Sequence, residues 1–168
     1  MKKTALIYSF HTSKTQKVAE KIQEDFGKAP IVAMNVESIT EKEFLSHDNL
    51  ILGASTWFDG ELPNFWDEFV PAIEDMDLHG KTIAIFGNGD QIAYGDNFVD
   101  AIGILANLLE SRGAKIVGMV PASSYTFIHS RAQRGDLLAG LALDWENQPK
   151  LNNPRIKAWV AQLKKELP

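Results

Sequence analysis

Short apolar runs separated by amphipathic stretches dominate the pattern of this chain. The runs carry few charged side chains, which is typical of strands that are covered on both faces in a parallel sheet. They fall at Ala5–Tyr8, Ile31–Val36, Asn49–Ser55, Lys81–Gly87 and Lys115–Val120. A long stretch follows at about 121–140, after which the apolar segment Leu141–Leu143 is predicted to resume the fifth strand.

Apolar residues recur at helical spacing between these runs. Val18, Ile22 and Phe26 mark one face of a helix that follows the first strand. Further helices are predicted at 63–75, 98–111 and from Pro154 onward, and the first of these is expected to bury Phe65 and Phe69. Alternating strands and helices predict a parallel sheet with helices on both faces.

Loops of unusual composition follow the first, third and fourth strands. The carboxyl ends of parallel strands meet at one edge of a sheet, and ligands bind there where the strand order reverses. We therefore expect these loops to form a single site.

The first loop is rich in hydroxyl groups and stands directly before a helix. It consists of Ser9, Phe10, His11, Thr12, Ser13, Lys14 and Thr15. A helix N-terminus presents unpaired backbone N–H groups, which makes this loop a candidate phosphate site. The same residue types are also typical of a simple helix cap, and the loop alone leaves both interpretations open. Neither the dinucleotide fingerprint nor the Walker loop is present.

The second and third loops each present one large aromatic residue beside small polar ones. Two rings from separate loops, Trp57 and Tyr94, are suited to enclosing a flat ligand. The polar residues Asn88 to Gln91, with Asn97, offer groups for the edge of a heteroaromatic ring. Taken singly, each aromatic is more typical of an ordinary exposed ring at the rim of an apolar surface.

Composition and charge narrow the function classes. The 168 residues include no cysteine, which excludes thiolate catalysis and cysteine-bound metal clusters, and they suit one domain spanning 1–168. No Lys or Arg lies between Lys42 and Lys81, although acidic residues are frequent there. Such a face repels nucleic acid and anionic membranes and favours a basic protein partner, and it is equally consistent with an ordinary solvated surface. No apolar run approaches the length of a membrane span, so we expect a cytoplasmic protein.

Several stretches resemble the flavodoxins, specifically the long-chain class, and the resemblance extends along essentially the whole sequence. The stretches are Leu52–Trp57, Gly60–Pro63, Phe86–Gln91, Tyr94, Asp96–Ala101 and Gly140–Asp144 through Val160. The long stretch after Val120 matches the insertion that separates long-chain from short-chain members. The resemblance implies a doubly wound, five-stranded parallel sheet in the order 2-1-3-4-5.

The resemblance also implies a function, which is single-electron transfer by non-covalently bound FMN without enzymatic turnover. It implies that the 9–15 loop holds the phosphate and that Trp57 and Tyr94 flank the flavin ring. The remaining cofactor contacts are expected from Ser55, Thr56, Phe58, Asp59, Gly60, Asn88, Gly89, Asp90 and Asn97. The implied partners are a flavin- or iron–sulfur-containing reductase as donor and an iron–sulfur or similar enzyme as acceptor. They would dock on the acidic face around Asp59–Asp77 of a monomer.

Departures from the family pattern concentrate in the first loop. A hydroxyl residue is usual at the position of Phe10 and glycine at that of Ser13, and His11 is unusual as well. These departures leave open a flavodoxin-like protein with weakened FMN binding. A separate alternative is an FMN-dependent quinone or nitro-compound reductase of similar fold.

Overall fold

The main sheet is parallel, with strand order β2-β1-β3-β4-β5, which confirms the predicted order. The structure is a computed structural model that describes residues 1–168. The strands of this sheet are β1 (Thr4–Tyr8), β2 (Ile31–Asn35), β3 (Asn49–Gly53), β4 (Thr82–Asn88), β5 (Lys115–Val117) and β9 (Leu141–Leu143). β1, β3 and β4 are buried along their whole length, as continuous apolar runs predict.

The fifth strand is interrupted, as the sequence predicts. β5 pairs with the first half of β4, from Thr82 to Ala84, and β9 pairs with the second half, from Phe86 to Asn88. The intervening segment forms a small antiparallel sheet in the order β6-β8-β7. Its strands are β6 (Val120–Pro121), β7 (Gln133–Arg134) and β8 (Leu137–Leu138).

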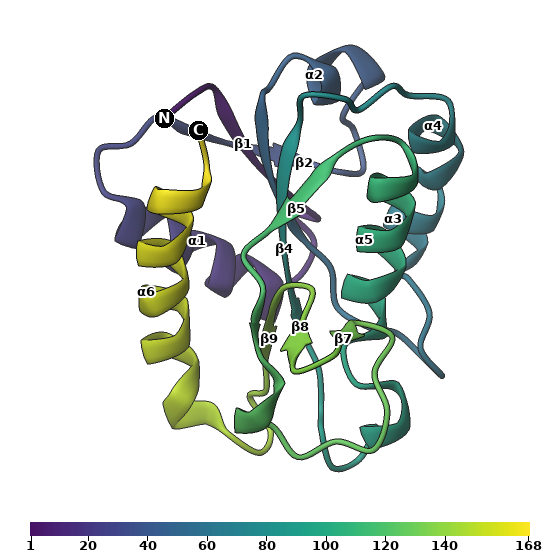
Figure 1. The fold of residues 1–168 in the computed structure, drawn as a ribbon, viewed down its shortest axis with the longest axis vertical. Coiled ribbons are helices and arrows are strands. Elements are labelled where there is room, and N and C mark those ends of the chain that lie inside the picture. Colours follow the sequence, from purple (N-terminus) through teal and green to yellow (C-terminus); the bar gives the residue numbers. More distant parts are fainter.

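Helices cover both faces of the main sheet (Figure 1). α1 and α6 lie side by side on one face, and α3, α4 and α5 lie on the other. The helices are α1 (Lys14–Phe26), α2 (Glu41–Leu45), α3 (Asn64–Asp67), α4 (Val70–Glu74), α5 (Asp100–Ser111) and α6 (Pro149–Glu166), with short 3₁₀ turns at Gly95–Asn97 and Ala122–Ser124.

Two helix predictions were wrong in detail. The helix expected at 63–75 is divided into α3 and α4, because Pro71 has no N–H to continue the ladder. Within it Trp66 is the fully buried ring, and its indole N–H donates to the carbonyl of Gly53 at 2.9 Å, whereas Phe65 and Phe69 are only partly buried.

The last helix begins at Pro149 and carries Pro154 inside it. The side chain of Asn152 ties this first part of α6 to the backbone of Asp144, donating to its carbonyl at 3.1 Å and accepting from its N–H at 3.2 Å. These two bonds stabilise the first turn of α6, which lies before the predicted helix start at Pro154.

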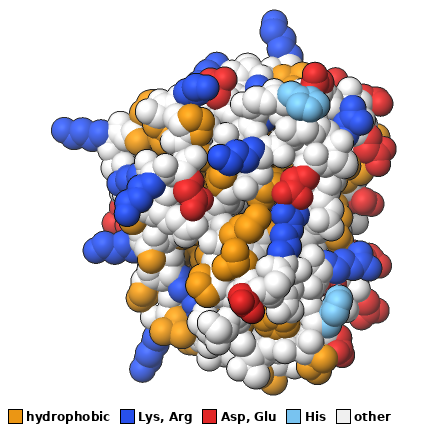
Figure 2. Space-filling view, in the orientation of Figure 1, with side chains coloured by type: hydrophobic (Ala, Val, Ile, Leu, Met, Phe, Trp, Pro, Cys, Tyr) orange, Lys and Arg blue, Asp and Glu red, His pale blue; other side chains and the backbone are white.

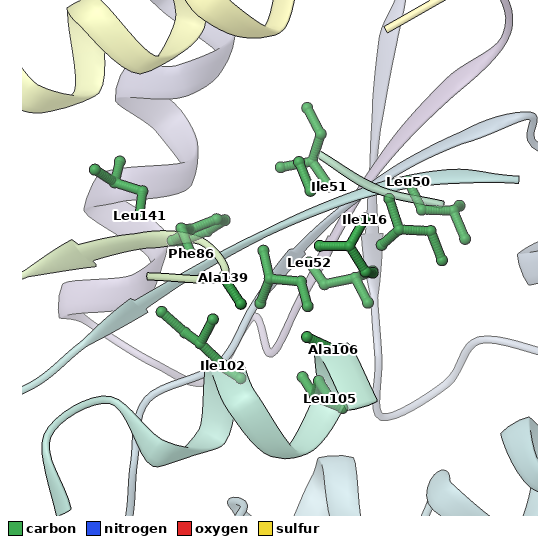
Figure 3. Close-up of a cluster of buried hydrophobic side chains, with 14 of the residues drawn as sticks. Leu50, Ile51, Leu52, Phe86, Ile102, Leu105, Ala106, Ile116, Ala139 and Leu141 are labelled. Atoms are coloured by element: carbon green, nitrogen blue, oxygen red, sulfur yellow. The ribbon is translucent and has the colours of Figure 1, made fainter. Parts of the chain in front are cut away.

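The core lies between the sheet and its helices (Figure 3). Leu52 of β3 points toward Leu105 and Ala106 of α5, while its neighbour Ile51 points to the opposite face, as the alternation of a strand requires. Because both faces are packed, the chain's polar chemistry is confined to the strand ends and the loops.

Candidate functional site

The loops that follow β1, β3 and β4 meet at one edge of the sheet, as predicted. The loops after β3 and β4 enclose a cavity of about 350 Å³ lined by Thr56, Trp57, Phe58, Gly89, Asp90, Tyr94, Asn97 and Val99. A second cavity of about 450 Å³ shares much of this lining and extends it toward the start of α1. It is lined by Lys14, Ser55, Thr56, Trp57, Asn88, Gly89, Asp90, Tyr94, Trp145 and Glu146. The candidate site is thus one elongated depression.

Trp57 is held firmly on one side of this depression. Its backbone N–H and carbonyl form a reciprocal pair of 2.8 Å hydrogen bonds with Glu61. Its ring packs edge-on against Phe65, with ring centroids 5.6 Å apart. These contacts fix the position of one aromatic wall.

The turn that carries Trp57 contains unusual backbone conformations. Phe58 adopts φ 48°, a left-handed conformation that is uncommon for an aromatic residue, and Gly60 adopts φ 91°. A Cβ on Gly60 would lie 2.5 Å from a carboxylate oxygen of buried Asp100, so only glycine fits there. The ring of Phe58 is 71% exposed as a result.

Tyr94 provides the other aromatic wall and is far less enclosed. Its side chain is 61% exposed. Its backbone N–H donates to the carbonyl of Asp90 at 3.0 Å, and its carbonyl accepts from Asn97 at 3.2 Å. The backbone of its loop is therefore ordered, although the ring itself projects toward solvent.

The helix at the first loop starts without a side-chain cap. Ser13 occupies the cap position and makes no capping hydrogen bond, and no acidic residue lies in the first turn of α1. The first N–H groups of a helix have no partner inside the helix. The side-chain cap that one of the two interpretations predicted is therefore not formed.

The other hydroxyls of the first loop mostly face the protein. Thr12 donates its hydroxyl to the carbonyl of Ser9 at 2.7 Å, and buried Ser9 donates to Glu37 at 2.8 Å. The ring of Phe10 packs against Tyr8, with centroids 5.0 Å apart. The group of available donors is therefore smaller than the sequence suggests and is centred on the start of α1.

Asn88 connects the two ends of the depression. This buried residue ends β4, and its amide donates to the hydroxyls of Thr15 at 3.2 Å and Ser55 at 3.4 Å. Its carbonyl oxygen accepts from the indole N–H of Trp145 at 3.1 Å. Asn88 thus binds protein groups from three loops.

A fourth loop, 144–148, belongs to the site and was missed by the sequence analysis. Trp145 and Glu146 line the second cavity, and Glu146 forms a 2.6 Å ion pair with Lys14 at the start of α1. These residues directly follow β9, which lies parallel beside β4. The rule that placed the other three loops at this edge would also have placed this one.

Asp144 anchors the fourth loop. Its carboxylate accepts from the backbone of Gln91 at 3.0 Å, the side chain of Gln91 at 2.8 Å and the side chain of Asn147 at 2.9 Å. Burial opposes its ionisation, but the hydrogen bonds from Asn147 and Gln91 outweigh burial and hold the pKa of Asp144 below its ordinary value. The ionised carboxylate of Asp144 therefore holds the 144–148 loop against the loop that follows β4.

The surface around the site is electrically asymmetric (Figure 2). Lys and Arg gather over α6 on the left of the view, and Asp and Glu lie along the right edge, on the side of α3 and α4. The acidic residues between Lys42 and Lys81 are all exposed: Glu43, Asp48, Asp59, Glu61, Asp67, Glu68, Glu74, Asp75 and Asp77. No cluster of three or more His, Asp or Glu side chains is arranged to bind a metal ion, and no helix is long and apolar enough to cross a bilayer.

Comparison with known proteins gives consistent matches. A sequence model of the flavodoxin family matches residues 6–159. A flavodoxin of Nostoc sp. strain PCC 7120 is 44% identical, covering 98% of this chain and 97% of the relative. Flavodoxin 1 of Escherichia coli strain K12 is 36% identical, covering 98% and 94%. Among solved structures, Fusobacterium nucleatum flavodoxin bound to flavin mononucleotide superposes with a TM-score of 0.93 at 30% identity, covering 99% of both chains.

Proposed function

Because this chain belongs to the flavodoxin family, we propose that it carries single electrons on an FMN bound between Trp57 and Tyr94. One observation carries the assignment of the site: the cavity walled by these two rings is continuous with the uncapped start of α1. FMN joins a flat ring to a phosphate, so its binding site needs these two features side by side.

The residues fit the phosphate end of FMN. The unpaired N–H groups at the start of α1 favour an anion, and the helix dipole adds to this preference. Ser13, Lys14 and Thr15 would hold the phosphate there. Lys14 already lines the cavity that leads from this point to the rings.

The residues also fit the ring end. Trp57 and Tyr94 would stack on the flavin, and Gly89, Asp90 and Asn97 line the same cavity with polar groups suited to a pyrimidine edge. The 144–148 loop adds Trp145 beside the chain that links ring and phosphate. We infer that Trp145 and Glu146 belong to the cofactor site together with the residues predicted from sequence.

Bound FMN supplies the one-electron chemistry, and the protein tunes its potentials. Trp57 and Tyr94 would exclude water from the ring. The exposed carboxylates Asp59 and Glu61 stand on the turn that carries Trp57, where negative charge disfavours adding a second electron. The backbone of Phe58 to Gly60 would offer a hydrogen-bond acceptor to the flavin edge.

The comparisons favour an electron carrier over a quinone or nitro-compound reductase, because the relatives are named flavodoxins. A reductase needs a flavin face that a nicotinamide can approach, and rings on both sides would restrict that approach. Photoreduction in the presence of FMN tests this function. We expect two separate one-electron steps and no NADPH oxidation by the protein alone, whereas rapid NADPH turnover would overturn the carrier assignment.

We propose that the acidic face Asp59–Asp77 docks basic redox partners, a reductase as donor and an iron–sulfur or similar enzyme as acceptor. The support is its exposed carboxylates, of which Asp59 directly follows Phe58 in the lining of the cavity where the ring would lie. Electron transfer from the photoreduced protein to a cationic c-type cytochrome tests this. The rate should fall steeply as salt is added. It should also fall in the Glu61→Gln and Asp67→Asn variants, but not in the control variant Glu24→Gln on α1. Equal rates in all variants would contradict docking on this face.

A further inference from the structure

A carboxylate from the turn after β2 is built into the first loop. Glu37 accepts a hydrogen bond from the hydroxyl of Ser9 at 2.8 Å, and the same oxygen lies 2.5 Å from Nδ1 of His11. The side-chain oxygen of Asn35 accepts from the N–H groups of both Phe10, at 3.3 Å, and Glu37, at 3.2 Å. Two turns far apart in sequence are thereby joined.

Glu37 is also connected to the backbone N–H of His11 through the hydroxyl of Ser9. The hydroxyl of Ser9 donates to Glu37 and accepts from the backbone N–H of His11 at 3.2 Å. That N–H is therefore engaged within the protein and is not free for an anion. The carboxylate, the buried hydroxyl and the N–H form one chain of hydrogen bonds.

The carboxylate is a fixed negative charge at neutral pH. The hydrogen bond with His11 and the one from Ser9 hold the pKa of Glu37 below its ordinary value. The loop that would receive a phosphate dianion thus already contains a negative group. A negative group in this loop repels a phosphate dianion, although solvent and salt weaken the effect.

We propose that Glu37 is a specificity-determining residue that lowers the preference of this chain for FMN over riboflavin. The inference rests on the proposed phosphate site at residues 9–15. Glu37 repels the phosphate and, through Ser9, withholds the N–H of His11. Riboflavin has the same ring but no phosphate, so Glu37 leaves its binding unaffected.

The test measures dissociation constants of the flavin-free protein for FMN and for riboflavin, by quenching of flavin fluorescence. The variants are Glu37→Gln, which keeps an acceptor for Ser9, and Glu37→Lys, which reverses the charge. Glu41→Gln and Glu41→Lys are matched controls, because Glu41 is exposed nearby at the start of α2. Circular dichroism confirms that each variant folds.

We expect Glu37→Gln to tighten FMN about three- to tenfold, and Glu37→Lys to tighten it further. Riboflavin binding should stay within about twofold, the controls should match the parent protein, and 1 M salt should remove most of the gain. An unchanged FMN constant in Glu37→Gln, or equal changes for FMN and riboflavin, would overturn the inference. If the parent protein binds neither flavin, the proposed function itself fails.

Discussion

The two ends of the candidate site are built differently. At the ring end, Trp57 is fixed by paired backbone bonds to Glu61 and by contact with Phe65. At the phosphate end, hydroxyls of the first loop bind other parts of the protein, as Ser9 does with Glu37. The Trp57 wall of the ring end is preorganised, while the phosphate end already holds a competing negative charge. We therefore expect that substitutions can change the affinity for the flavin ring and the affinity for the phosphate group separately.

Removing the fixed aromatic wall should have the largest effect. Trp57→Ala should cost about 1–3 kcal/mol of binding free energy, because one stacked ring is lost. The loss should be equal for FMN and riboflavin, measured by fluorescence titration. Ile92→Ala, an exposed residue outside the cavity lining, is the control. A loss confined to FMN would break the distinction between the two ends.

Removing the link between the ends should affect stability as well as binding. Asn88→Ala leaves the indole N–H of Trp145 and the hydroxyls of Thr15 and Ser55 without their shared partner. We expect a loss of about 1–3 kcal/mol in the free energy of unfolding, measured with urea in the absence of flavin. Unchanged stability would show that solvent replaces this network at no cost.

A charge at the ring end should alter potential rather than affinity. Asp59→Asn should raise the second one-electron midpoint potential of the FMN-loaded protein by about 20–40 mV. This is the effect expected from one charge several ångströms from the flavin in a medium of high dielectric constant. Spectroelectrochemical titration measures this shift. Glu37→Gln is the counterpart at the other end and should move the potential less. No change or a fall in Asp59→Asn would contradict the account.

The exposed ion pair across the site should matter least. Lys14 and Glu146 are 54% and 58% exposed, and such pairs contribute at most about 1 kcal/mol. Glu146→Gln should therefore change FMN affinity only a few-fold in titration. A much larger loss would mean that this pair acts as a clamp that holds the cofactor in place.

The pattern of strands and loops could be predicted because it follows from periodicity. Buried apolar runs such as Asn49–Gly53 predicted the parallel sheet. The loops that follow these runs predicted that the site lies at the carboxyl edge of the sheet. Helix details depended on single residues, since Pro71 interrupts one predicted helix and Asn152 stabilises an early turn of another. The effects of such single residues on helix boundaries do not follow from the periodicity of apolar residues.

The inner surface of the first loop could not be predicted in the same way. Glu37 lies 28 positions from Ser9, and nothing in either segment indicates that they bind each other. Sequence reading treated every hydroxyl of the loop as available to a ligand. Trp145 is different, because Leu141–Leu143 was predicted to resume the fifth strand, and the topology rule therefore covers the loop that follows it.

The most direct test of the central claim is titration of the purified, flavin-free protein with FMN. We expect one FMN to bind per chain and its fluorescence to be quenched by Trp57 and Tyr94. Quenching should be largely lost in Trp57→Ala at the same FMN concentration. A folded parent protein that leaves FMN fluorescence unchanged at every concentration would contradict the assignment of this site.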